Sequence, residues 1–239
     1  MRKSFMAAGT AALAIGAAGI AYAQNPAPAP TATASVTPSK AGTKAKPKAV
    51  KLKLAVKNNV ESKTTASKIQ ITLPRTLKLS TKGLKQCTAS DDAIIAAPTT
   101  TCRSSVAGKG TAHALINPYA PTPFAINFNV TVFVGKKELI FYLHATNFTT
   151  DAVLHGKISG RRLTIAINPE LQQPTPGVYS ALVDLSASMQ KKRGRASLFS
   201  TTGCVGGKHK IGVTISYVPN PTPPAASTAS TTAEAKCTK

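Results

Sequence analysis

Few residues of this 239-residue chain combine the types and spacing that nucleophilic catalysis needs. Ser188-Met189-Gln190-Lys191 matches the Ser-x-x-Lys pattern, in which a lysine activates a serine, but the partner motifs Lys-Thr-Gly and Ser-x-Asn are missing. Gly108-Lys109-Gly110-Thr111 and Gly206-Gly207-Lys208 resemble pieces of phosphate-binding loops but lack the Walker spacing. We interpret the first motif as a strand that runs into a basic turn and the other two as turns. No catalytic residue is predicted, and the chain is not expected to be an enzyme.

The histidines, carboxylates and cysteines form no recognisable metal-binding or acid–base pattern. His113, His144, His155 and His209 are scattered, and neither Cys-x-x-Cys nor His-x3-His spacing occurs. A dyad of Cys102 with His113 would need a free thiolate. We therefore expect no metal and no cofactor. A small hydrolase, whose site would be assembled across strands, stays as the least favoured hypothesis for the function.

Residues 1–23 have the three parts of a secretory signal peptide. They comprise a basic start, an Ala/Gly-rich apolar stretch from 5 to 20, and a small-x-small site that ends at Ala23, before Gln24. The apolar stretch is short and weakly hydrophobic for a membrane span, and no cysteine follows it for lipid attachment. We expect cleavage between Ala23 and Gln24 and a secreted or cell-envelope protein without a transmembrane anchor.

Four cysteines in an exported chain indicate disulfides, and four allow three pairings. Cys87 and Cys102 flank a loop whose closure would stabilise the fold by about 3 kcal/mol, and we favour this pair. Cys204 with Cys237 is the second pair, which would tie the end of the chain back to the domain. A free, reactive Cys237 is the alternative.

Composition divides the rest of the chain into a domain and two flanking segments. Residues 24–48 are rich in Pro, Ala and Lys and predict a disordered linker, partly polyproline II. Residues 219–239 have a similar Pro/Ser/Thr/Ala composition and predict a flexible tail. The segment between them, 49–218, is long enough for one hydrophobic core.

Apolar residues alternate with polar ones through most of residues 49–218, which is the pattern of half-buried strands. Residues 50–56 and 124–134 show it most clearly. Turns at 135–137 and 159–161 each predict a hairpin. No stretch of ten residues has helical spacing. The sequence therefore predicts an all-β fold, an antiparallel β-sandwich that is Ig-like or related, with about eight to ten short strands.

Positive charge dominates the composition. Lys and Arg number 30 against 8 Asp and Glu, so the net charge is +22 and falls to +20 once Arg2 and Lys3 are removed. The densest basic patch is a predicted turn that contains Lys191, Lys192, Arg193 and Arg195. One interpretation of this charge is electrostatic binding to anionic polymers of a cell envelope, such as teichoic acids, lipopolysaccharide or acidic glycans. Solubility and the protection of exposed strand edges are the alternative reading.

Other ligands have weaker support. Export and the absence of an aromatic RNA-binding motif exclude nucleic acid as an expected partner. Carbohydrate-binding sites usually present exposed aromatic rings, and this chain has no Trp. A groove lined by Tyr119, Tyr142 or Tyr179 would support a carbohydrate-binding module, which is the main alternative function.

Three cysteine-containing segments carry a resemblance to other proteins. They are Leu84-Lys85-Gln86-Cys87, the run from Cys102 to Ala112 with its Gly-x-Gly-x-Ala, and the final Cys237. The arrangement resembles a group of uncharacterised exported proteins from high-GC Gram-positive bacteria, with a signal peptide, a linker and a Cys-containing β domain. Arg103 stands where some members have Pro. The resemblance covers residues 50–239, supports the cysteine pairing and the sandwich, and implies no activity.

These observations lead to one main hypothesis. The protein is expected to be an exported, non-enzymatic β-sandwich, a binding or structural module with electrostatic affinity for anionic polymers. Its ligand and its oligomeric state are not specified by the sequence.

Overall fold

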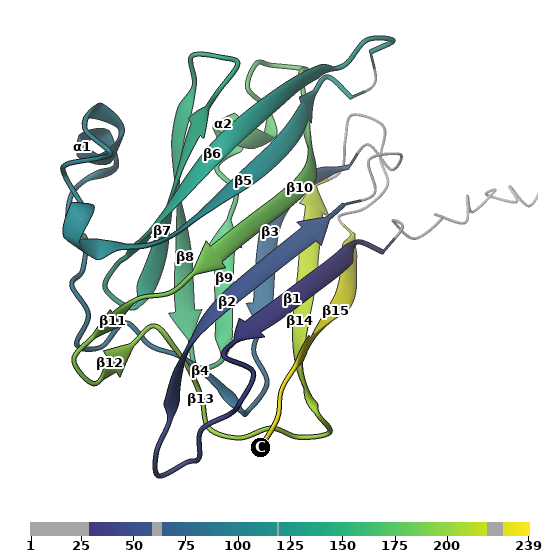
Figure 1. Ribbon diagram of the computed structural model, residues 1–239. Helices are drawn as coiled ribbons and strands as arrows, with labels where there is room; N and C mark the ends of the chain where they lie inside the picture. The colour runs from purple at the N-terminus through teal and green to yellow at the C-terminus, as the bar shows by residue number, and fades with distance from the viewer. Residues whose placement is uncertain (1–28, 59–63, 119, 219–226) are drawn as a thin grey trace, which may run out of the picture.

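The protein is an all-β chain in the computed structural model, which describes residues 29–58, 64–118, 120–218 and 227–239 (Figure 1). The predicted signal peptide, its Ala23–Gln24 cleavage site and residues 219–226 lie outside the described residues. Fifteen strands and three short helical segments are present in the described part: β1 Thr31–Thr37, β2 Lys48–Lys57, β3 Thr65–Thr72, β4 Leu77–Leu79, α1 Asp91–Ala96, the 3-10 turn η2 Arg103–Ser105, β5 Val106–Ile116, β6 Phe124–Val134, β7 Glu138–Ala145, β8 Asp151–Ser159, β9 Arg162–Ala166, α2 Pro169–Gln172, β10 Ser180–Met189, β11 Lys192–Arg193, β12 Ala196–Ser197, β13 Phe199–Thr201, β14 Lys208–Val218 and β15 Thr228–Lys236.

Alternation at period two decides which face of each strand enters the core. In β2, Leu52 and Leu54 are buried while Lys51 and Lys53, which alternate with them, are exposed. The predicted hairpins are present, since β6 pairs with β7 and β8 pairs with β9, both antiparallel. The prediction of an all-β, antiparallel fold is confirmed.

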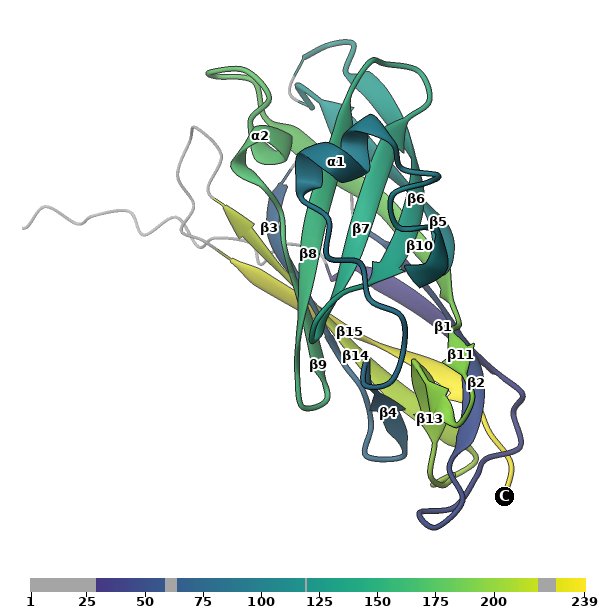
Figure 2. The ribbon, with the colours of Figure 1, turned by 90° about the vertical axis from the view of Figure 1, so that its left-hand side faces the viewer.

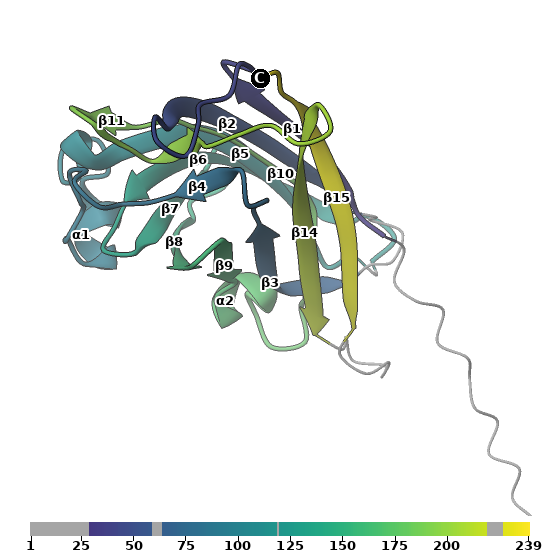
Figure 3. The same ribbon diagram turned by 90° about the horizontal axis from the view of Figure 1, so that it is seen from below.

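One long sheet folds back on itself to form the two layers. Its strand order is β15-β14-β3-β9-β8-β7-β6-β5-β10-β2-β13-β4, and β1 pairs with the other edge of β2. Seen from below, β1, β2, β10 and β5 lie over β3, β14 and β15 (Figure 3). β1 lies alongside β15, and beyond them Ala41 and Thr238 are joined by a 2.8 Å backbone hydrogen bond. The two ends of the described chain therefore meet.

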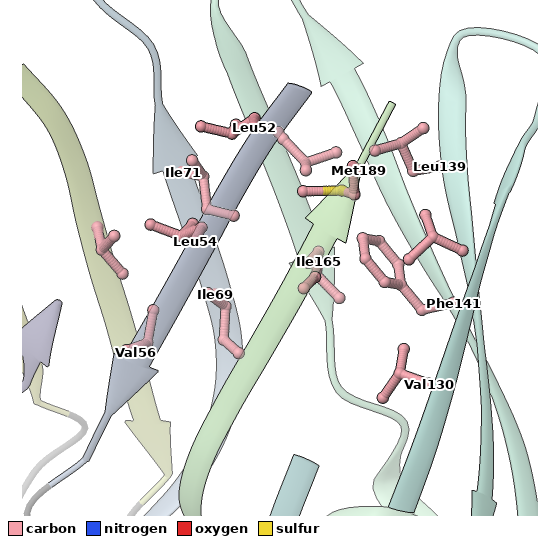
Figure 4. Close-up of a cluster of buried hydrophobic side chains, with 14 of the residues drawn as sticks. Leu52, Leu54, Val56, Ile69, Ile71, Val130, Leu139, Phe141, Ile165 and Met189 are labelled. Atoms are coloured by element: carbon pink, nitrogen blue, oxygen red, sulfur yellow. The ribbon is translucent and has the colours of Figure 1, made fainter. Parts of the chain in front are cut away.

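Side chains from both layers fill the space between them. Leu52 and Met189 from one layer approach Ile71 and Ile165 from the other (Figure 4). These residues are buried, and burying each aliphatic side chain contributes about 1.5–3 kcal/mol. The main core is thus a conventional two-layer apolar interior.

Helix α1 lies on the outer side of the sheet, near β7 and β8 (Figure 2), and a second, smaller core packs beneath it. Ser90 caps this short helix by accepting a hydrogen bond from the Ala93 amide, and two aspartates occupy its first turn, where the helix dipole favours negative charge. Ile94 of α1 is fully buried against Phe133 and Ile140, which point outward from β6 and β7. Phe133 thus explains why both faces of β6 are apolar at this end.

Two predictions about the termini and the strand number are wrong. Residues 31–37, assigned to the linker, form β1, and residues 228–236, assigned to the tail, form β15. The number of strands therefore exceeds the expected eight to ten, also because β4, β11, β12 and β13 are only two or three residues long. The backbone of β15 pairs with β14, and this pairing does not require large side chains. The small residues Ala233 and Ala235 are therefore buried as part of the sheet.

Candidate functional site

An apolar cavity of about 390 Å³ lies between the layers at the end of the sandwich near α2. Inward-facing residues of six strands line its inner part: Phe128, Phe141, Leu154, Ile165, Ile69 and Leu185. Its volume is within the range of about 300–1,000 Å³ that is typical of small-molecule sites.

Small residues on β5 explain why the layers leave space here. The inward positions Ala112 and Ala114 sit between Leu185 and Leu182 of β10 and Phe128 and Ile126 of β6. Ala66 contributes a third small side chain from β3 in the opposite layer. Near the other end of the sandwich the inward positions carry larger residues, such as Leu139 and Leu198, which fill the interior.

Two exposed phenylalanines stand at the mouth of the cavity. Phe124 is 48% exposed and Phe148 is 55% exposed. Their rings meet edge to face with centroids 5.8 Å apart, a favourable arrangement for aromatic pairs. Glu170 and Leu171 of α2 also line the cavity, and α2 is tied to the sheet because the Ser180 hydroxyl donates a hydrogen bond to the Leu171 carbonyl. An aromatic pair and a fixed helical turn therefore both contribute to the lining.

Charged groups are scarce around this cavity. No lysine or arginine is among its described lining residues, although the chain carries 30 of them. Glu170 at the exposed start of α2 is the one carboxylate of the lining, and His113 directs its Nδ1 to Asp184 at 2.6 Å. The interior is therefore suited to an apolar molecule that carries no negative charge.

The four cysteines form the two pairs favoured from the sequence. Cys87 is bonded to Cys102, and Cys204 to Cys237, with Cα separations of 5.3 Å and 5.7 Å. No cysteine is free, which leaves no thiol for a Cys–His dyad. Two disulfides are typical of proteins from oxidising compartments.

The basic patch forms a small hairpin. Lys192 and Arg193 of β11 pair with β12, and Gly194, with φ at 56°, makes the turn between them. Lys192, Arg193 and Arg195 are exposed, while Lys191 is partly covered. The hairpin lies at the opposite end of β10 from the cavity mouth, so the structure does not bring the two together.

Each histidine has a separate partner. His144 contacts Asp151 at 2.8 Å, and Asp151 also accepts a 2.8 Å hydrogen bond from the Tyr142 hydroxyl. Burial, together with that hydrogen bond and the Asp151 charge, raises the pKa of Tyr142 to about 12. His155 contacts Asp91 and Glu138. Among the described residues no group of histidine, cysteine and carboxylate side chains is placed to hold a metal ion.

The Ser-x-x-Lys motif does not form a catalytic dyad. Ser188 lies near the end of β10, and Lys191 follows the strand, just before β11. Its hydroxyl is buried and has no hydrogen-bond partner. The motif is thus part of a strand that runs into a basic turn.

The tyrosines do not form an exposed aromatic platform in the part of the chain described here. Tyr142 and Tyr217 are buried, and the Tyr217 hydroxyl donates a 2.7 Å hydrogen bond to Asn58. Tyr119 lies outside the described residues. Neither helix within these ranges has the length or apolar character to cross a bilayer.

Comparisons with protein-family models, with curated proteins and with solved structures find no match. Function is therefore inferred from the geometry of the chain itself.

Sequence reasoning missed the cavity because strand alternation shows which residues face inward but not how well opposite layers fill the space. One signal was present. Two consecutive inward positions of β5 are alanine, in a sheet whose other inward positions are mostly large.

Proposed function

We propose that this protein is an exported, non-enzymatic binding module that holds a small, apolar, uncharged molecule in its interior cavity. The observation that carries the proposal is a cavity of about 390 Å³ whose described lining is almost entirely apolar and includes no lysine or arginine. A volume of this size would hold about a dozen water molecules, at about 30 Å³ for each, and so has room for a small organic molecule. Burial of the apolar surface of the ligand supplies the affinity.

Charge separates this ligand class from fatty acids and other anionic amphiphiles. A carboxylate at the mouth would face Glu170 and would find no lysine or arginine in the lining. An uncharged apolar molecule has no such cost, and its binding should depend little on salt.

The test uses N-phenyl-1-naphthylamine, an uncharged probe whose fluorescence rises in apolar surroundings. Ala114→Phe places a ring in the cavity, and Ala166→Phe, on the exposed face of β9, is the matched control. Wild type and Ala166→Phe should bind the probe equally at low and high salt, and Ala114→Phe should bind at least ten-fold more weakly. Equal binding by the two variants, or loss of binding in high salt, would overturn the proposal.

A second candidate function is electrostatic attachment to anionic polymers, and the distribution of ion pairs favours it. Among the described residues one ion pair involves lysine or arginine, that of Lys208 with Glu234 at 2.6 Å. The other ion pairs join histidines to Asp91, Glu138, Asp151 and Asp184. Most cations of the surface are therefore available to an external polyanion.

Binding of this kind should weaken as salt rises, because the screening length falls from about 10 Å at 0.1 M to about 3 Å at 1 M. The check is cosedimentation with an insoluble anionic cell-wall polymer across that range. Replacement of Lys191, Lys192, Arg193 and Arg195 by Gln should weaken it while the melting temperature barely changes, since exposed charges contribute little to stability. Salt-independent attachment would contradict this function.

A further inference from the structure

Ser188 is a buried polar group without a partner, on the face of the sheet that points away from the core. It lies on β10, with β2 on one side and β5 on the other. Its hydroxyl oxygen is buried and makes no hydrogen bond. Because nearly all buried hydroxyls in folded proteins are bonded, an unpaired one calls for a ligand or a role.

Lysines flank this serine on both neighbouring strands. Lys53 of β2 and Lys109 of β5 are the residues directly opposite Ser188 in the two strand pairs. Neighbouring strands lie about 4.8 Å apart, so both side chains rise beside the same hydroxyl. Lys51 follows on the same face of β2, two residues away. Three lysines therefore project from the same face of the sheet at positions next to one unpaired hydroxyl.

The surface is hollowed at this point. A shallow, open depression is lined by Lys51, Lys109, Ser188 and Gln190 together with residues 106–108. No carboxylate is among its described lining residues. Gln190 is held in place because its backbone N–H donates a 2.7 Å hydrogen bond to the Ala107 carbonyl. The depression thus combines lysine side chains, the Gln190 side chain and the unpaired Ser188 hydroxyl, without a carboxylate among its described lining residues.

These donors suit a phosphate group. A phosphate presents several acceptor oxygens and a full negative charge, and lysine ammonium groups are common phosphate ligands. The chain also continues from Gln190 directly into the basic hairpin, where Lys192, Arg193 and Arg195 are exposed. A flexible polymer with repeating phosphates could occupy the depression with one phosphate and contact the hairpin with the next.

A membrane surface fits this region less well than a polymer does. Peripheral membrane proteins combine basic residues with apolar side chains that enter the bilayer. The exposed aromatic pair, Phe124 and Phe148, is at the opposite end of β5 and β6, because Phe124 pairs with Ile116 whereas the depression begins at Val106.

We propose that the depression around Ser188, with Lys51, Lys53 and Lys109, is a phosphate-binding subsite for a phosphodiester polymer of the cell envelope. This inference rests on the second function proposed above and gives that function a defined location. The hairpin of Lys192, Arg193 and Arg195 extends the subsite along the chain of the polymer.

The experiment compares two double variants that remove the same charge. Lys53→Gln/Lys109→Gln changes the subsite, and Lys68→Gln/Lys157→Gln changes exposed lysines of β3 and β8, outside it. Binding to poly(glycerol phosphate) is measured by calorimetry at one fixed ionic strength. The first variant should bind at least ten-fold more weakly than wild type, and the second less than three-fold more weakly.

A third variant, Ser188→Ala, leaves the charge unchanged. It should fold normally, since the hydroxyl makes no hydrogen bond within the protein, and should weaken binding two- to five-fold. Inorganic phosphate should shift the amide resonances of 188–190 in wild type at millimolar concentration and should not do so in this variant.

Three outcomes would overturn the inference, and each has a different meaning. Equal weakening by the two double variants would keep electrostatic binding but remove the subsite. No binding of the polymer by wild type at low salt would remove the second function as well. Ser188-dependent binding to phosphatidylglycerol vesicles without binding to the polymer would reassign the subsite to a membrane.

Discussion

Two regions of this molecule each contain one disulfide and one nearby histidine, but the histidine is partly exposed in one region and buried in the other. The segment of α1 is closed by Cys87–Cys102 and lies on the outside of the sheet, where His155 is 38% exposed. The end of the chain is closed by Cys204–Cys237 and includes β15, next to which His209 is fully buried. The first region packs on the outside of the sheet, and the second supplies its edge strand β15.

The two histidines show what this difference does to a titrating group. Partial burial by itself lowers the pKa of His155, but hydrogen bonds to Asp91 and Glu138 and their negative charges outweigh burial, so its pKa is raised. Both ring nitrogens contact carboxylates, at 3.0 Å and 3.2 Å, which the protonated ring alone can satisfy as a double donor. Burial lowers the pKa of His209, whose Nδ1 bonds to Thr76 and whose Nε2 has no partner. The carboxylate partners therefore set the direction of the pKa shift at His155, and burial sets it at His209.

The largest expected effect comes from removal of the disulfides. Cys204 and Cys237 are separated by 33 residues, and Cys87 and Cys102 by 15. Chain entropy alone predicts losses of about 3.7 kcal/mol and about 3 kcal/mol when each pair is replaced by Ala. Urea unfolding measures both free energies.

The location of the damage separates the two regions more clearly than its size. Loss of Cys204–Cys237 should increase hydrogen exchange throughout β14 and β15, whose amides are protected by their mutual pairing. Loss of Cys87–Cys102 should leave these strands protected and expose the segment around α1. Unchanged protection of β15 in the first variant would show that the disulfide does not complete the sheet.

A smaller effect is expected from His209 as a function of pH. Its pKa is lowered in the folded protein, so the unfolded chain takes up the proton more readily. Its contribution to stability is therefore complete above about pH 6.5 and is lost as the pH falls, with a slope of at most about 1.4 kcal/mol per pH unit. His209→Leu removes this loss.

The measurement is the free energy of unfolding of wild type and His209→Leu at pH 7, 6 and 5. As the pH falls, the free energy of unfolding of His209→Leu should increase relative to that of wild type. If the free energies of unfolding of the two proteins changed in parallel over this pH range, protonation of His209 would not destabilise the folded protein.

The smallest effect, with the opposite sign, is expected from His155. Its pKa is raised in the folded protein, so its contribution is complete below about pH 6.5 and is lost as the pH rises through the folded pKa. His155→Gln should therefore cost stability at pH 5.5 and almost none at pH 8.5. NMR titration of the ring should give a pKa above that of a free histidine, and a value below it would refute the role of Asp91 and Glu138.

Much of this fold could be predicted because strand alternation and short turns are properties of neighbouring residues in the sequence. The alternation in 50–56 and 124–134 fixes which side chains face the core, and the short turns at 135–137 and 159–161 leave antiparallel pairing as the one economical arrangement. Terminal strands β1 and β15 were missed for the same reason. Their inward residues are mostly alanine, so hydrophobicity did not distinguish them from a linker, and pairing with β2 and β14 makes them strands.

The sequence by itself determined the all-β class, the hairpins, the excess of positive charge and cysteines in a number and spacing that suit two disulfides. Only the tertiary structure decided where the layers leave a cavity, because packing depends on which side chains meet across a gap of about 10 Å between residues far apart in the chain. The same holds for Ser188 between Lys53 and Lys109 and for the pKa values of His155 and His209. Each of these properties depends on strand register and burial, which bring together residues that no sequence spacing relates.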